Sequence, residues 1–188
     1  MPTDNTRQIY VVISQTGTFL SRILKRITGA QYNHASLSLS PTLQNMYSFG
    51  RMNPYNPFWG GFVTESPNFG TFKRFSNTRV IVLALDISEE NYENMRLYLE
   101  QMVSDKHKYG YNYLGLYLAA LHIIYTRQNR YYCSEFVREI LKKYKIDGAD
   151  GLSPIVHPIH FLTLPHKTVF TGKLSEYSYQ NTEKVIPM

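Results

Sequence analysis

Residues 33–41, NHASLSLSP, alternate strictly between polar and apolar side chains. This period of two predicts a β-strand with Ala35 and Leu37 on its apolar face and His34 at the start of its polar face. After a short turn, residues 46–51, MYSFGR, are predicted to form the hairpin partner of this strand. A core histidine would be expected on the apolar face, so the position of His34 favours a role in chemistry.

Residues 131–141, YYCSEFVREIL, contain the single cysteine of the chain, Cys133. Its apolar side chains recur at spacings of three and four, which predicts a helix from Cys133 to about Tyr144. A thiol at a helix N-terminus lies at the positive end of the helix dipole, which favours the nucleophilic thiolate. The alternative interpretation is a small, buried apolar residue without chemistry.

The remaining pattern predicts an α+β chain with a small antiparallel sheet packed against helices. We expect buried strands at 8–14 and 79–85 and a last strand at 169–174; the expected helices are 17–29, 88–104 and 113–125. Residues 52–78 are rich in Asn, Pro, Gly and aromatics, and we interpret them as a long ordered loop with a short strand at 61–64. A lid is one function for such a loop.

Length and composition restrict the class of protein further. The chain has 188 residues, a formal net charge of +6 and one cysteine. We expect a single domain over 1–188, without internal disulfides or a zinc site that needs two thiolates. The first 80 residues hold eight Lys or Arg against two acids, which favours either an anionic surface as partner or a solvated basic face.

Several function classes lack their signatures. The chain has no phosphate-binding glycine loop and no RNA-binding signature, so we expect no cofactor and no specific nucleic acid. His157 and His160 are interpreted as surface histidines, and no metal site is expected. The N-terminus does not resemble a secretory signal and no apolar stretch is long enough to span a bilayer, so a cytoplasmic protein without a transmembrane segment is expected.

The histidine strand NHASLSLS, its partner MYSFGR and the later helix start YYCSEFV together resemble the circularly permuted NlpC-like papain-fold cysteine hydrolases, the YiiX-like proteins. The order, histidine before cysteine, is that of the permuted branch and of the lecithin:retinol acyltransferase-like proteins. The resemblance covers about residues 9–164 and implies a permuted papain-like fold. It also implies that Cys133 is the nucleophile and His34 the general base.

The third catalytic position is less clear from the resemblance. In the family it lies on the strand after the histidine strand, often as Glu or His, and here Ser48 occupies that position. A hydroxyl orients an imidazole only weakly, so Glu65 in the long loop is the alternative, and Ser48 would then be a strand residue with no role. The oxyanion hole would use the Cys133 backbone N–H and a further donor, for which Tyr132 is a candidate.

The sequence therefore predicts a cysteine hydrolase that acts on an amide or ester through an acyl-enzyme. The resemblance allows a peptide or peptidoglycan fragment, an acylated amine or a lipid ester as substrate. One alternative is a non-catalytic binding module on the same fold, and another is a basic protein that binds anionic surfaces.

Overall fold

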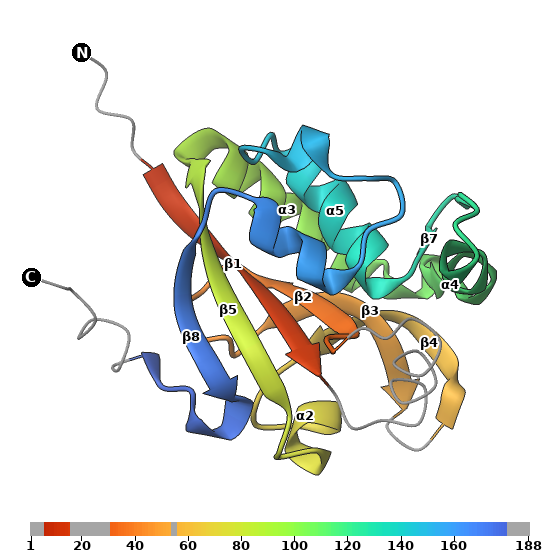
Figure 1. The fold of residues 1–188 in the computed structure, drawn as a ribbon, viewed down its shortest axis with the longest axis horizontal. Coiled ribbons are helices and arrows are strands. Elements are labelled where there is room, and N and C mark those ends of the chain that lie inside the picture. Colours follow the sequence, from red (N-terminus) through yellow and green to blue (C-terminus); the bar gives the residue numbers. More distant parts are fainter. Residues whose placement is uncertain (1–5, 16–30, 54–55, 180–188) are drawn as a thin grey trace, which may run out of the picture.

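The structure is a computed structural model that describes residues 6–15, 31–53 and 56–179. Its architecture is α+β, with one eight-stranded sheet and helices packed on it (Figure 1). The strands are β1 (Thr6–Gln15), β2 (His34–Ser38), β3 (Met46–Asn53), β4 (Asn56–Glu65), β5 (Arg79–Ser88), β6 (Gly110–Tyr111), β7 (Arg130–Tyr131) and β8 (Lys167–Lys173). The helices are α2 (Gly70–Arg74), α3 (Glu89–Ser104), α4 (Tyr113–Ala120) and α5 (Cys133–Lys143), with short 3-10 turns at Lys106–Lys108, Ala149–Gly151, Pro158–Thr163 and Leu174–Glu176.

The strand order across the sheet is β7-β6-β4-β3-β2-β1-β5-β8. Neighbouring strands are antiparallel except β6 and β7, which run parallel. The sheet is therefore larger than the small antiparallel sheet that the sequence predicted, and it is mixed. The strands that the sequence did not predict, β6 and β7, are only two residues long each, and β4 is longer than the short strand expected at 61–64.

Both faces of the sheet are covered, because alternate side chains of its central strands enter two different cores. One core lies under α3 and α5 (Figure 1) and contains Val11, Leu37 and Phe49. The second core lies on the opposite face and contains Val12 and Phe72, the latter from α2. The two cores explain why the polar face of β2 is also buried.

Three predicted elements are confirmed closely. The strand predicted at 46–51 pairs antiparallel with β2 and extends to Asn53. Helix α3 begins after Ser88, whose hydroxyl accepts a hydrogen bond from the Asn91 N–H at 3.3 Å. Helix α5 begins at Cys133 and ends at Lys143.

Two predictions were wrong. Residues 52–78 are not a long loop: the short strand expected at 61–64 is part of the longer β4, and α2 follows it. The helix predicted for 113–125 ends at Ala120, and the residues that follow it up to Arg130 are exposed. The helix predicted for 17–29 lies outside the described residues.

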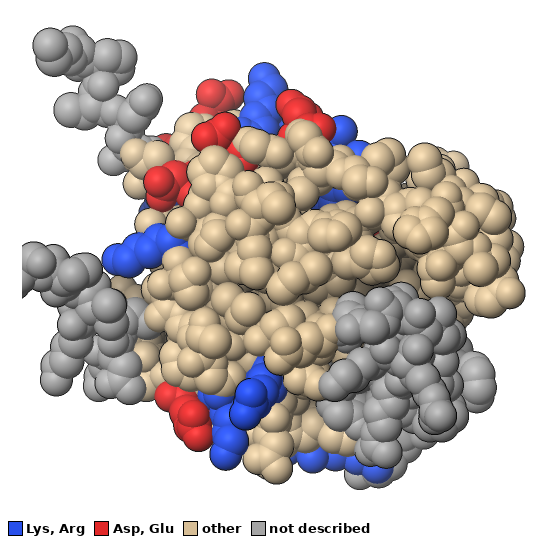
Figure 2. All heavy atoms as spheres, in the orientation of Figure 1, with Lys and Arg blue, Asp and Glu red and all other residues tan. Residues whose placement is uncertain are grey.

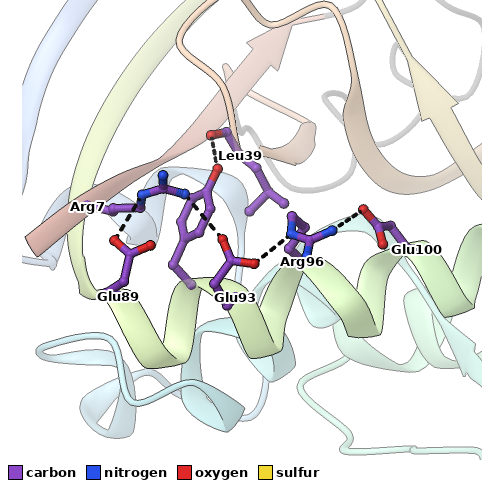
Figure 3. Close-up of polar contacts among 7 residues, drawn as sticks. Arg7, Leu39, Glu89, Glu93, Arg96 and Glu100 are labelled. Carbon is purple, nitrogen blue, oxygen red and sulfur yellow. Dashed lines mark hydrogen bonds and ion pairs between the residues drawn. The ribbon is translucent and has the colours of Figure 1, made fainter.

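A chain of ion pairs connects β1 to α3 (Figure 3). The Arg7 guanidinium lies 3.0 Å from Glu89 and 3.4 Å from Glu93, and Arg96 links Glu93 to Glu100 at 2.8 and 2.7 Å. These side chains are largely exposed, so solvent screens the pairs and each contributes little to stability. The ion pairs link the start of β1 to α3 above the apolar core.

Candidate active site

The first feature of the candidate site is the start of helix α5. Its N-cap residue, Tyr132, has an extended backbone, and the Tyr132 N–H donates a hydrogen bond to Glu135 Oε2 at 3.2 Å. This contact is one half of a capping box and sets the direction in which the helix begins. Cys133 is therefore held in the first turn, where backbone N–H groups have no partner within the helix. Its side chain is buried, and its Sγ lies 3.9 Å from the Asn33 carbonyl oxygen.

The second feature is His34, which follows Asn33 and begins β2. The packing of α5 on β2 and β3 brings Cys133, at the start of α5, close to His34, at the start of β2. The His34 ring is largely buried, with 13% of its side chain exposed. Its Nε2 lies 2.9 and 3.0 Å from the two carboxylate oxygens of Glu65, and Cys133 is near enough to the ring to affect its protonation.

The surroundings of His34 change its protonation. Burial disfavours the charged ring, but the negative charge of Glu65 and the hydrogen bonds to Cys133 and Glu65 outweigh that effect. Together they raise the pKa of His34 to about 10. At neutral pH the ring is therefore an imidazolium between a carboxylate and a sulfur atom.

Glu65 occupies the third position of this arrangement. It is the last residue of β4 and its side chain is 12% exposed. Ser36, two residues after His34 on the same face of β2, donates a hydrogen bond to Glu65 Oε2 at 2.6 Å. The carboxylate thus receives hydrogen bonds from two β2 side chains, which fix its orientation.

Ser48, the first candidate for the third position, points elsewhere. It is fully buried, and its hydroxyl donates to the Ala35 carbonyl oxygen at 2.7 Å. The structure places Glu65 against His34 and uses Ser48 to tie β3 to β2. Gly50, also on β3, lies beside the pair: a Cβ there would make ordinary van der Waals contacts with Glu65 Oε1 at 3.5 Å and His34 Cε1 at 3.6 Å.

Two tyrosines lie near the thiol. Tyr132 is buried beside Cys133, and burial together with the charges of Glu135 and Cys133 raises the pKa of its hydroxyl. The same effects, with burial again the largest, raise the pKa of Tyr111 well above its ordinary value. Both phenols are therefore protonated at neutral pH and are available as hydrogen-bond donors, in addition to the Cys133 backbone N–H.

A buried polar pair, Glu135 and Asn112, lies next to the start of α5. Glu135 and Asn112 are 5% and 1% exposed, and the Asn112 amide nitrogen lies 3.5 Å from Glu135 Oε2. Asn112 also caps α4 by accepting a hydrogen bond from the Gly115 N–H at 3.0 Å. Burial raises the pKa of Glu135 to about 7, although the hydrogen bonds from Tyr132 and Asn112 act against that rise.

The sequence analysis did not identify four residues that surround the site, namely Ser36, Tyr111, Asn112 and Glu135. Two of them carried a usable signal. Glu135 stands three residues after the helix N-cap, the spacing of a capping box, and Ser36 shares the polar face of β2 with His34. Asn112 and Tyr111 become neighbours of Cys133 only through the short parallel pairing of β6 with β7.

A small pocket opens at Cys133, with a volume of about 30 Å³. Its walls come from the β1–β2 connection, α4, the start of α5 and residues 156–158. The Ser134 hydroxyl donates to the Val156 carbonyl oxygen at 2.7 Å and holds that last wall in place. His157 also lines the pocket, next to Pro158. The pocket wall is mostly apolar. An uncharged substituent of a carbonyl group positioned at Cys133 would therefore fit it.

Among the described residues, no cluster of His, Cys, Asp or Glu has the arrangement of a metal site, and no helix is long and apolar enough to cross a membrane. His157 and His160 lie side by side, with the His157 N–H donating to His160 Nδ1 at 3.3 Å.

No protein-family model matches this chain, and neither a curated protein nor a solved structure matches it significantly. The candidate site therefore rests on its own geometry.

Proposed function

We propose that this chain is a cysteine hydrolase of the permuted papain-like kind, with Cys133 as nucleophile, His34 as general acid and base, and Glu65 as the residue that orients the imidazole. The observation that carries the proposal is that a buried histidine contacts a carboxylate, while the thiol of Cys133 lies against the carbonyl oxygen of Asn33, the residue before that histidine. A nucleophile, a base and a group that orients the base are the three parts that acyl transfer requires.

The chemistry follows from the protonation of His34. An imidazolium stabilises the Cys133 thiolate, which attacks the carbonyl carbon of an ester or amide. A carbon–sulfur bond forms, the bond to the leaving group breaks, and His34 gives its proton to the departing alcohol or amine. Water then attacks the thioester while His34 takes its proton, and the acid product and the free thiol are released.

Charge that develops on the carbonyl oxygen needs hydrogen-bond donors. The Cys133 N–H is the first candidate because it lies in the first helical turn. Tyr132 lines the same pocket as Cys133, and Tyr111 pairs with Tyr131 just before the helix start; both hydroxyls are protonated at neutral pH. They are the candidates for the second oxyanion donor, and Tyr132 is the one that the sequence analysis named.

The proposal is tested first on the thiol itself. We expect iodoacetamide to alkylate Cys133 rapidly at pH 7, and His34→Ala to slow this alkylation. His166→Ala is a matched control, because the His166 ring is bonded to the Leu164 carbonyl oxygen and not to the thiol. Cys133→Ala should abolish hydrolysis of short-chain aryl esters and leave the circular dichroism spectrum unchanged.

A thiol that reacts like free cysteine and is indifferent to His34→Ala would refute the proposal. Together with a lack of ester and amide hydrolysis, that result would favour a binding module on the same fold.

A further inference from the structure

Helix α4 and the segment after it expose an unusual amount of apolar surface. Tyr117 and Ile124 are 63% and 60% exposed, and no charged residue occurs between Lys108 and Arg127. Figure 2 shows the end of the molecule that carries α4 without charged side chains on this face, whereas charged residues gather elsewhere. We call this surface the α4 apolar surface; its members are Tyr113, Leu114, Tyr117, Leu121, Ile123, Ile124 and Tyr125.

Contiguous apolar surface of this kind marks an interaction site, because single exposed apolar residues are ordinary but clusters are not. The other side of the same helix is part of the candidate active site. Leu116, Ala119 and Ala120 line the pocket at Cys133. One element therefore presents apolar side chains both to the surroundings and to the nucleophile.

Cations flank the α4 apolar surface in the sequence and in space. Lys106 and Lys108 precede it, while Arg127 and Arg130 follow it. The pairing of β6 with β7 places Gly110 opposite Arg130, so the two ends of the segment meet at the base of α4. All four cations are exposed, and Lys108 pairs with Asp105 at 2.9 Å. An apolar surface with cations at its base fits a membrane interface with anionic lipids, into which apolar side chains insert while basic groups contact the headgroups.

We propose that the α4 apolar surface docks on an anionic phospholipid bilayer and that the substrate of Cys133 is an acyl ester or amide of a membrane lipid. The inference rests on the proposed function and names its substrate class. The lipid carbonyl would reach Cys133 along α4, and the apolar pocket would hold the first carbons of the acyl chain. The chemistry is the acyl transfer described above, with the lipid alcohol or amine as leaving group and water as acceptor.

Docking is tested by sedimentation of the full chain with two kinds of vesicle, phosphatidylglycerol mixed with phosphatidylcholine and phosphatidylcholine alone. We expect tighter binding to the anionic vesicles, weakened by salt. The combined change Leu114→Ser, Tyr117→Ser and Ile124→Ser should lower the affinity by roughly tenfold or more, since three half-exposed apolar groups no longer enter the bilayer. The change Arg127→Gln with Arg130→Gln should reduce the preference for anionic vesicles by about tenfold or more.

The matched control carries Leu97→Ser and Val103→Ser, which change exposed apolar residues of α3 and should leave binding unchanged. Circular dichroism and thermal unfolding establish that each variant is folded. Binding that survives the triple substitution, or is lost equally in the α3 control, would overturn the proposal. So would a dimer that the triple substitution dissociates in a chain that binds no vesicles, because the surface would then serve a second copy.

The membrane-docking inference and the cysteine hydrolase proposal can be refuted independently. Cys133→Ser should bind vesicles like the unmodified chain and release no fatty acid from them. If soluble esters are hydrolysed but vesicles are not bound, the docking inference falls and the cysteine hydrolase stands. If vesicles are bound but the thiol is unreactive toward every ester and amide, the hydrolase falls and with it the substrate assignment.

Discussion

Replacing Glu65 by Gln should return His34 to the neutral form at physiological pH. Burial alone lowers the pKa of His34, and the charge of Glu65 is the largest of the effects that raise it to about 10. Cys133 contributes too, so the cleanest comparison is made in a Cys133→Ala background. In that background we expect His34 to stay protonated beyond neutral pH with Glu65 present. With Glu65→Gln added, the carboxylate charge is gone and burial is the largest remaining effect, so the pKa should fall below its ordinary value of 6.5.

The size of the effect follows from the same values. A rise from 6.5 to about 10 corresponds to roughly 5 kcal/mol of favourable interaction with the charged ring, since each pKa unit is worth about 1.4 kcal/mol. A folded-state pKa above the unfolded value stabilises the fold fully below pH 6.5, and the contribution is lost as the pH rises to about 10. Glu65→Gln should therefore cost a few kcal/mol of unfolding free energy near pH 6, and less with each step toward pH 10.

Two measurements check this prediction. Nuclear magnetic resonance of the histidine ring protons follows the titration of His34, which is assigned by its loss in His34→Gln. Urea unfolding at several pH values gives the stability. If His34 titrates at the same pH with and without Glu65, or if the cost of Glu65→Gln does not shrink above pH 7, the carboxylate does not hold the ring charged and the assigned role is wrong.

Two further predictions concern groups around the site. Ser36→Ala removes the hydroxyl that donates to Glu65 and should lower the alkylation rate of the thiol at pH 7 several-fold. Ser48→Ala removes the hydrogen bond to the Ala35 carbonyl oxygen; it should cost about 1 kcal/mol of stability and leave the dependence of alkylation on pH unchanged. Equal alkylation profiles for the two variants would contradict this. Glu135→Gln should raise stability above pH 7, because a buried carboxyl whose pKa is raised from 4.5 to about 7 destabilises the fold as pH rises through that interval, by up to about 3 kcal/mol. Unfolding curves at pH 4.5 and 8 test this, and a loss of stability at pH 8 would show that the carboxylate itself is needed.

The sequence predicted the parts of the site that depend on local pattern. The alternation of residues 33–41 placed His34 on the face opposite Ala35 and Leu37, and the helical spacing after Cys133 placed the thiol at a helix start; both placements are confirmed. Each is decided within one element, where a period of two or of 3.6 suffices.

The prediction failed for a segment in which glycines allow other parts of the chain to approach the backbone closely. Gly60 was expected in a loop and Gly61 at the start of a short strand, yet both lie inside the ten-residue strand β4 and pair with β3. A Cβ at Gly60 would lie 2.6 Å from the Tyr113 hydroxyl oxygen, so a side chain there would collide with the start of α4. Glycine at position 60 therefore allows a close contact with Tyr113 of α4, which is distant in the sequence. No local pattern can show such a contact.

The third catalytic position shows the same limit more sharply. A search of the strand beside the histidine strand leads to Ser48 on β3, but the carboxylate comes from β4, one strand further. Glu65 pairs with Met46 on β3, and its carboxylate extends to His34 and Ser36 on β2. The Ser48 hydroxyl instead donates to the Ala35 carbonyl oxygen. Which residue contacts His34 depends on the pairing of β2, β3 and β4, which no pattern within one strand can show.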